Sequence, residues 1–184
     1  DNPSLYGTVE VEMYGVYGQL TVHTLQEQFF KKFQAEWIPS IGYQIHIGNL
    51  SLYTQYDFYR YTGGTLFDGS KASDNNYDEW DIGFSWGPWY GEYSYSVTKP
   101  TGGGHDSWLT LGANHDFGPF YMDGSFNFQR FEPEGKNRFT NFILKIGRQF
   151  GNGLEPFAAV SIGGQDAQNQ KIGSRFYAGL QYNF

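Results

Sequence analysis

The sequence predicts an all-β protein in which a closed antiparallel transmembrane β-barrel forms one domain over residues 1–184. Three observations carry this prediction. Apolar and polar residues alternate along successive segments of about eleven residues, which is the pattern of strands with two unlike faces. Short and long polar joints alternate between the segments, as turns and loops do in an up-and-down sheet. The polar face is poor in charge, so it suits a hydrated interior better than a surface in bulk water.

The first 48 residues predict two long strands. Residues 8–22 alternate apolar side chains with glutamates, namely Val9, Val11 and Met13 against Glu10 and Glu12. The alternation slips near residues 15–18, which indicates a β-bulge within one strand. Residues 33–48 keep one parity throughout and predict a single strand, with Pro39 at a bend or on an edge.

From residue 50 onward the chain predicts eight further strands. They cover residues 50–61, 75–87, 88–98, 107–118, 119–131, 138–150, 154–164 and 174–184. Their joints are alternately short, such as the Gly-Pro pairs at 87–88 and 118–119, and long and polar. The total is about 10 strands, with 12 possible if both of the first two segments divide. In a barrel, the short joints would be periplasmic turns and the longer joints extracellular loops.

Composition excludes several kinds of chemistry. The chain has no cysteine, so it has no disulfide, no thiolate nucleophile and no zinc-thiolate site. The formal net charge of −7 argues against nucleic acid as a partner, because a phosphate backbone requires a basic surface. No apolar run is long enough for a membrane helix, but strands of a barrel cross with alternating residues. The opening DNPSLYG lacks the charged and apolar parts of a signal peptide, and we expect the signal peptide to have been removed already.

The chemistry of the two faces favours a membrane barrel over a soluble sandwich or a lipocalin-like barrel. Soluble barrels fill their apolar face with branched aliphatic residues and cover their polar face with Lys and Glu. Here aromatic residues make up 20% of the chain and gather toward the ends of the segments, as rings do at the headgroups of a bilayer. The predicted lipid-facing aromatic band consists of Trp37, Trp80, Phe84, Trp86, Trp89, Phe142 and Phe184.

The last strand, RFYAGLQYNF, alternates apolar residues and ends on Phe184. In this respect the whole chain resembles Gram-negative outer-membrane β-barrel proteins, whose final strand typically ends in this way and is thought to be recognised by the assembly machinery. The segments YDEWDIGFSWGPWYGEYSYS, DSWLTLGANHDFG and NFILKIGRQFG look like those of TorF-type porins, over about residues 41–165. The FYAGLQYNF end is similar to that of small KdgM-type oligosaccharide channels, although the strongly basic lumen of that family is not evident here.

The resemblance implies a bacterial outer-membrane location. The partners it implies are outer-membrane lipids and lipopolysaccharide, the assembly machinery through the C-terminal strand, and small polar solutes. The expected function is a porin for passive diffusion of small hydrophilic solutes, with an acidic lumen that favours neutral or cationic ones. The alternation predicts these pore-lining residues: Glu10, Glu12, Glu36, His46, Asp57, Asp81, Glu92, Asp123, Lys145 and Gln181. Of these, Glu10, Glu12 and Glu36 are expected to form one acidic patch.

Two alternatives stay open beside the porin. One is a surface, adhesin-type or structural barrel whose lumen is plugged by its own charged side chains; the long polar loop at 62–76 is typical of exposed loops. The other, ranked below it, is an outer-membrane hydrolase. Only the triplet His105, Asp106 and Ser107 looks catalytic, and adjacent residues on a glycine-rich loop rarely hold a nucleophile and a base in register. We therefore expect no enzyme activity, no cofactor and no metal site.

Overall fold

The computed structural model describes residues 6–25, 34–63, 71–98, 105–131, 136–151, 153–165 and 171–182. These residues form one antiparallel sheet in which the strands follow one another in chain order. The strands are β1 (Tyr6–Met13), β2 (Val16–Leu25), β3 (Gln34–Ile47), β4 (Leu50–Thr62), β5 (Tyr77–Trp86), β6 (Trp89–Ser96), β7 (Ser107–Phe117), β8 (Phe120–Phe131), β9 (Lys136–Arg148), β10 (Leu154–Gly163) and β11 (Arg175–Tyr182). One short 3₁₀ helix, η1 (Ala72–Asn75), precedes β5. Within the described ranges, no helix has the length and apolar character needed to cross a membrane.

The prediction of an all-β antiparallel sheet is confirmed, but the predicted strand count is wrong. The sheet has 11 strands, where the sequence predicted about 10 with 12 possible. The segment at 8–22 divides into β1 and β2 at a turn over Tyr14 and Gly15, so the slip in its alternation is not a bulge. The strand order begins at β1 and ends at β11, and closure into a barrel is not shown by this order.

Proline 39 lies inside the sheet, since β3 is paired with both β2 and β4. It faces Leu20 of β2 in the register. The pairing of β3 with β4 skips Ile38 and Pro39 and resumes at Ser40, opposite Asp57. A proline has no N–H to donate to a ladder, so a local interruption is the expected result. The edge position that the sequence allowed for Pro39 is therefore wrong. Pro39 lies within the sheet, and the pairing of β3 with β4 is interrupted there.

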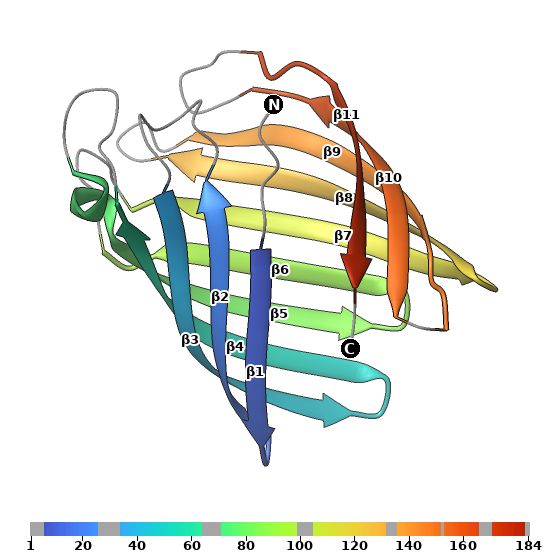
Figure 1. The fold of residues 1–184 in the computed structure, drawn as a ribbon, viewed down its shortest axis with the longest axis horizontal. Helices are drawn as coiled ribbons and strands as arrows, with labels where there is room; N and C mark the ends of the chain where they lie inside the picture. Colours follow the sequence, from blue (N-terminus) through green and yellow to red (C-terminus); the bar gives the residue numbers. More distant parts are fainter. Residues whose placement is uncertain are drawn as a thin grey trace. The chain divides into compact units, whose positions relative to one another are not determined.

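The chain divides into two compact units. The first comprises Asp1–Ile82 and Ser94–Asp106, and the second comprises Gly83–Tyr93 and Ser107–Phe184. Strands β1 to β4 lie side by side within the first unit, and β7 to β11 follow one another within the second (Figure 1). Strands β5 and β6 contribute one part to each unit.

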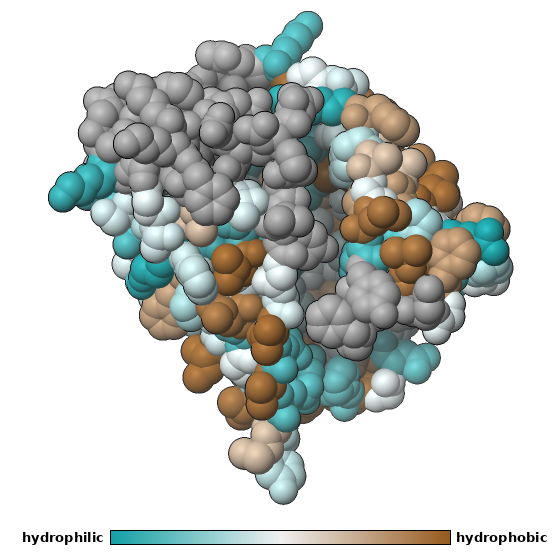
Figure 2. All heavy atoms as spheres, in the orientation of Figure 1, coloured by the Kyte–Doolittle hydropathy of each residue, from teal (hydrophilic) through white to brown (hydrophobic). Residues whose placement is uncertain are grey.

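Burial on the two faces of the sheet is the reverse of that in a soluble protein, because polar side chains are buried and large apolar side chains are exposed. In the first unit Asp57, Glu79 and Asp81 are buried, while Ile41 and Trp80 are exposed. In the second unit the buried side chains include Ser125, Glu155 and Ser161, and the exposed ones include Phe126, Phe176 and Leu180. Figure 2 shows apolar side chains at the surface over β1 and β2, and others over β10 and β11. We call the buried set the polar face and the exposed set the apolar face.

Two short joints of the sheet are two-residue turns whose glycines suit the geometry. At 87–88 and 118–119 a Gly-Pro pair connects two strands, and Gly87 and Gly118 have φ of 55° and 68°. A positive φ at the first central residue is what a type II′ hairpin turn requires. Parts of the longer joints, at residues 64–70, 99–104, 132–135 and 166–170, lie outside the described residues.

Candidate functional site

Three carboxylates meet on the polar face of the first unit. Asp57 comes from β4, and Glu79 and Asp81 come from β5, the next strand in the order. All three residues are buried. One oxygen from each carboxylate lies within 4.8 Å of the others. Because residues two apart on a strand share a face, Glu79 and Asp81 necessarily approach the neighbouring strand together. We call this group the acidic cluster.

Neutral donors bind two members of the acidic cluster. The Nε2 of Gln55 donates a hydrogen bond of 2.7 Å to Oδ1 of Asp57. The hydroxyl of Tyr59 donates a hydrogen bond of 3.2 Å to Oε1 of Glu79. The Tyr59 ring is itself held by stacking on Tyr77, with centroids 4.4 Å apart and planes 5° from parallel.

The third member of the cluster, Asp81, is only 6% exposed. Its Oδ1 is buried and has no hydrogen-bond partner among the described residues. Burying a carboxylate oxygen without a donor or a cation is unfavourable, because water no longer solvates it. The side chain of Asp81 does interact with Asp57 and Ser94, but its Oδ1 accepts no hydrogen bond within the described part of the chain.

A second polar network, in the other unit, contains a cation of its own. The hydroxyl of Tyr121 donates a 2.5 Å hydrogen bond to Oε1 of Glu155, and Nζ of Lys145 lies 3.5 Å from the same oxygen. The ammonium group also lies over the ring of Phe157, 4.4 Å from its centroid. Here one carboxylate receives both a hydroxyl donor and a positive charge, an arrangement that compensates a buried charge well.

The predicted pore-lining residues fall into three groups. Buried on the polar face are Glu36, Asp57 and Asp81; half-buried are Glu92, Asp123, Lys145 and Gln181; exposed are Glu10, Glu12 and His46. The hydroxyl of Tyr90 donates a 3.1 Å hydrogen bond to Asp123. Among the exposed residues, Nδ1 of His46 lies 2.7 Å from the hydroxyl oxygen of Ser51.

The expected acidic patch of Glu10, Glu12 and Glu36 does not form. Strand β2 lies between β1 and β3, so the glutamates are not on neighbouring strands. The register places Glu36 opposite His23, whose Nδ1 is 3.3 Å from the Glu36 carboxylate. The carboxylate of Glu12 accepts a 2.7 Å hydrogen bond from Gln44. The hairpin that replaced the expected bulge is the physical reason, because it inserts a whole strand between these residues.

The aromatic residues expected to face lipid are mostly on the exposed face. Trp37, Trp80, Phe84, Trp86 and Trp89 are all exposed. Phe142 is half-buried, with its ring 4.8 Å from that of Phe126, and Phe184 lies outside the described residues. Phe139 is also exposed and contacts Phe126, because the register between β8 and β9 shifts at Asn127 and Phe128. Such a shift brings residues of opposite parity to one face.

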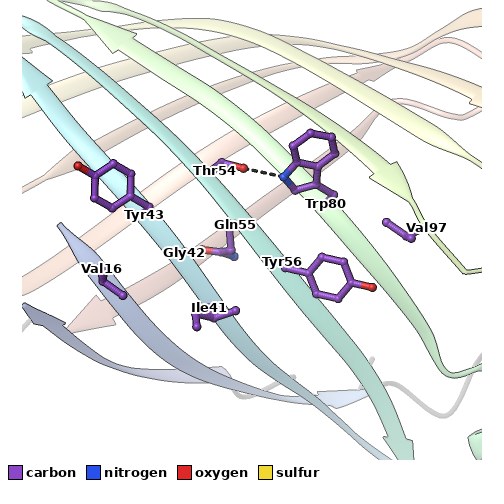
Figure 3. Close-up of a pocket in the computed structure, with 9 residues that line it drawn as sticks. All are labelled: Val16, Ile41, Gly42, Tyr43, Thr54, Gln55, Tyr56, Trp80 and Val97. Atoms are coloured by element: carbon purple, nitrogen blue, oxygen red, sulfur yellow. Dashed lines mark hydrogen bonds between the residues drawn. The ribbon is translucent and has the colours of Figure 1, made fainter.

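A groove of about 550 Å³ lies on the apolar face of the first unit (Figure 3). The small side chain of Thr54 stands there among the larger rings of Tyr43, Tyr56 and Trp80. The indole Nε1 of Trp80 donates a 2.6 Å hydrogen bond to Oγ1 of Thr54, which in turn donates to the main-chain oxygen of Asp81. The indole N–H is thus satisfied within the protein, so the ring is suited to apolar surroundings.

His105 belongs to the triplet that resembles a catalytic arrangement in sequence, and in the structure its ring contacts the main chain. Nδ1 of His105 lies 2.8 Å from the carbonyl oxygen of Ser96, so this nitrogen must carry the proton. Its ring stacks on Tyr95, with centroids 5.6 Å apart. The geometry thus assigns His105 a structural contact.

Sequence reasoning missed two acidic residues of the polar face, Glu79 and Glu155. Both are buried and both take part in the networks described above. The alternation held the signal for Glu79, because it shares its parity with Asp81. The same parity argument places Glu155 with Ala159 and Ser161.

The chain was compared with protein-family models, with curated proteins and with solved structures. No family model matches, and neither of the other two comparisons found a significant match.

Proposed function

We propose that this protein is a β-barrel of the bacterial outer membrane, closed by its first and last strands, with the apolar face in contact with lipid. The reversal of burial between the two faces is the observation that carries this proposal. Side chains such as Leu180, 73% exposed, would form an apolar surface far too continuous for a monomer in water. A bilayer offers no hydrogen-bond partner to the backbone, so a sheet that crosses it must close on itself.

The proposed activity is passive diffusion of small hydrophilic solutes through the barrel. The acidic cluster, with Glu36 nearby in the same unit, supplies several carboxylates on the polar face. Fixed negative charge in a narrow path of low dielectric lowers the entry barrier for cations and raises it for anions. Neutral or cationic solutes would therefore pass in preference to anions. Short turns would face the periplasm and long loops the exterior, with lipopolysaccharide around the outer rim.

A second candidate is a barrel whose interior is filled by its own side chains. The specific observation in its favour is that polar side chains are bonded to one another rather than left open. Tyr121, Glu155 and Lys145 form such a network. A barrel of this kind would act through its loops or as a structural element of the membrane.

Conductance measurements separate the two candidates. The protein is refolded in detergent, its folded state is verified by faster migration on an unheated gel, and it is inserted into a planar bilayer across a KCl gradient. We expect discrete channels and a reversal potential of the sign that indicates cation preference. Absence of conductance from protein verified as folded would favour the filled barrel. A reversal potential that indicates anion preference would contradict the acidic path. Extraction of the native protein into buffer without detergent would refute the membrane location.

A further inference from the structure

The acidic cluster has the size of a cation site. The three oxygens that Asp57, Glu79 and Asp81 contribute lie within 4.8 Å of one another. Oxygens bound to one Ca²⁺ ion lie roughly 2.3–2.6 Å from it, so two ligands on opposite sides are about 4.6–5.2 Å apart. The three oxygens are therefore close enough together for one divalent cation to contact all of them.

The unpartnered oxygen of Asp81 indicates that a ligand is missing from the cluster. Oδ1 is enclosed by protein, on a residue that is 6% exposed, and it accepts no hydrogen bond from the described residues. In the second unit the comparable buried carboxylate, Glu155, has Lys145 beside it. A positive charge at the acidic cluster would compensate Asp81 in the same manner.

Arg60, the nearest arginine along β4, is not available to play this role. It has the opposite parity to Asp57, and its guanidinium is bound to Asp78 at 2.7 Å and to the carbonyl oxygens of Tyr59 and Tyr77. Its position over the ring of Phe58 fixes it further on that face. Arg60 is therefore close to the acidic cluster in sequence, but its side chain lies on the opposite face of β4.

The ligand atoms also define the kind of ion. All three are carboxylate oxygens. Hard oxygen ligands suit Ca²⁺ and related cations, whereas Zn²⁺ sites usually include nitrogen or sulfur. From this geometry we propose that Asp57, Glu79 and Asp81 bind a divalent cation of the Ca²⁺ class. The site belongs to the first unit alone and does not depend on the proposed channel.

Terbium luminescence tests the proposal directly. Tb³⁺ replaces Ca²⁺ at oxygen sites, and Tyr59, which donates to Glu79, is placed to sensitise its emission. We expect folded protein, stripped with chelator in detergent, to bind about one Tb³⁺ per chain, displaced by Ca²⁺. Asp81→Asn should lower the affinity about tenfold or more, because it removes a charged ligand. The matched control is Glu155→Gln, a buried carboxylate with its own cation, which should leave Tb³⁺ binding unchanged.

A second measurement covers the case in which Asp81→Asn fails to fold. Ca²⁺ at constant ionic strength should raise the unfolding temperature of the unaltered protein, because a ligand that binds only the folded state stabilises it. Asp57→Asn should abolish that increase. Absence of saturable Tb³⁺ or Ca²⁺ binding by folded protein would overturn the proposal, as would binding by both aspartate variants that is as tight as that of the unaltered protein. A barrel that binds Ca²⁺ without conducting would refute the channel and leave the cation site intact.

Discussion

At the scale of single residues, tyrosine rings lie against glycines of the next strand. A Cβ added to Gly42, Gly112 or Gly147 would collide with the ring of Tyr17, Tyr90 or Tyr121, respectively. Each ring occupies the space that a side chain would otherwise fill, and close approach of this kind is a common reason for glycine within a strand. The hydroxyls of Tyr90 and Tyr121 then reach carboxylates beyond, Asp123 and Glu155. The glycines therefore determine where the carboxylates of the second unit are held.

Replacing Gly147 with alanine should destabilise the protein. The new methyl group would push Tyr121 off the strand and weaken its hydrogen bond to Glu155. Overpacking at such a site costs roughly 1–3 kcal/mol. The free energy of unfolding, followed by tryptophan fluorescence in urea with lipid present, measures the effect. Gly124→Ala is the matched control on β8, since its Cβ would make only ordinary contacts with Phe142 and Leu144. Equal losses in both variants would contradict the role given to the ring.

At the scale of elements, the first hairpin shows why strand counting from sequence is ambiguous. Met13 and Val16 are partners across the turn, and both are exposed, although one position is odd and the other even. A two-residue turn therefore reverses the parity of the apolar residues, and so does a one-residue bulge. The pair Tyr14 and Gly15 is also far from the Asn-Gly signal typical of such turns. Alternation alone could not distinguish the two structures.

The same hairpin contains a strained residue whose replacement should stabilise the protein. Tyr14 has φ of 55° and Gly15 has φ of 82°, the pattern of a type I′ turn. A bulky residue is unfavourable in this left-handed region, whereas asparagine adopts it more readily. Tyr14 is 93% exposed, so little burial is lost on substitution. Tyr14→Asn should raise the free energy of unfolding by about 1 kcal/mol in denaturant titrations. A loss of stability would show that the Tyr14 ring makes contacts that outweigh the strain.

At the scale of the whole molecule, the sheet could be predicted from sequence but the acidic cluster could not. Alternation is averaged over many residues in every strand, so single exceptions such as Phe139 do not alter the fold class. The cluster depends on how β4 and β5 are offset along each other. A shift of two residues would keep every side chain on its face and yet carry Asp57 away from Asp81. The length and polarity of the connection between these strands, residues 63–76, do not specify that offset.

The membrane location predicts a difference between geometric exposure and chemical reactivity. The chain has no cysteine, so single thiols can be placed at will. Ile41 is 57% exposed on the apolar face, Ser40 beside it is buried on the polar face, and Tyr14 stands at a turn. In lipid vesicles, Ile41→Cys should react slowly with N-ethylmaleimide, because the reactive thiolate does not form in hydrocarbon. Tyr14→Cys should react quickly, and every variant should react fully once unfolded.

The third thiol reports on the polar face. Ser40→Cys should react at an intermediate rate if the interior is hydrated, and as slowly as Ile41→Cys if side chains fill it. Mass spectrometry of the adducts over time gives all three rates in one assay. Rapid reaction of Ile41→Cys in vesicles, at the rate of Tyr14→Cys, would mean that water and not lipid covers the apolar face. The reversed burial would then require a protein partner, since so much apolar surface is not stable against water.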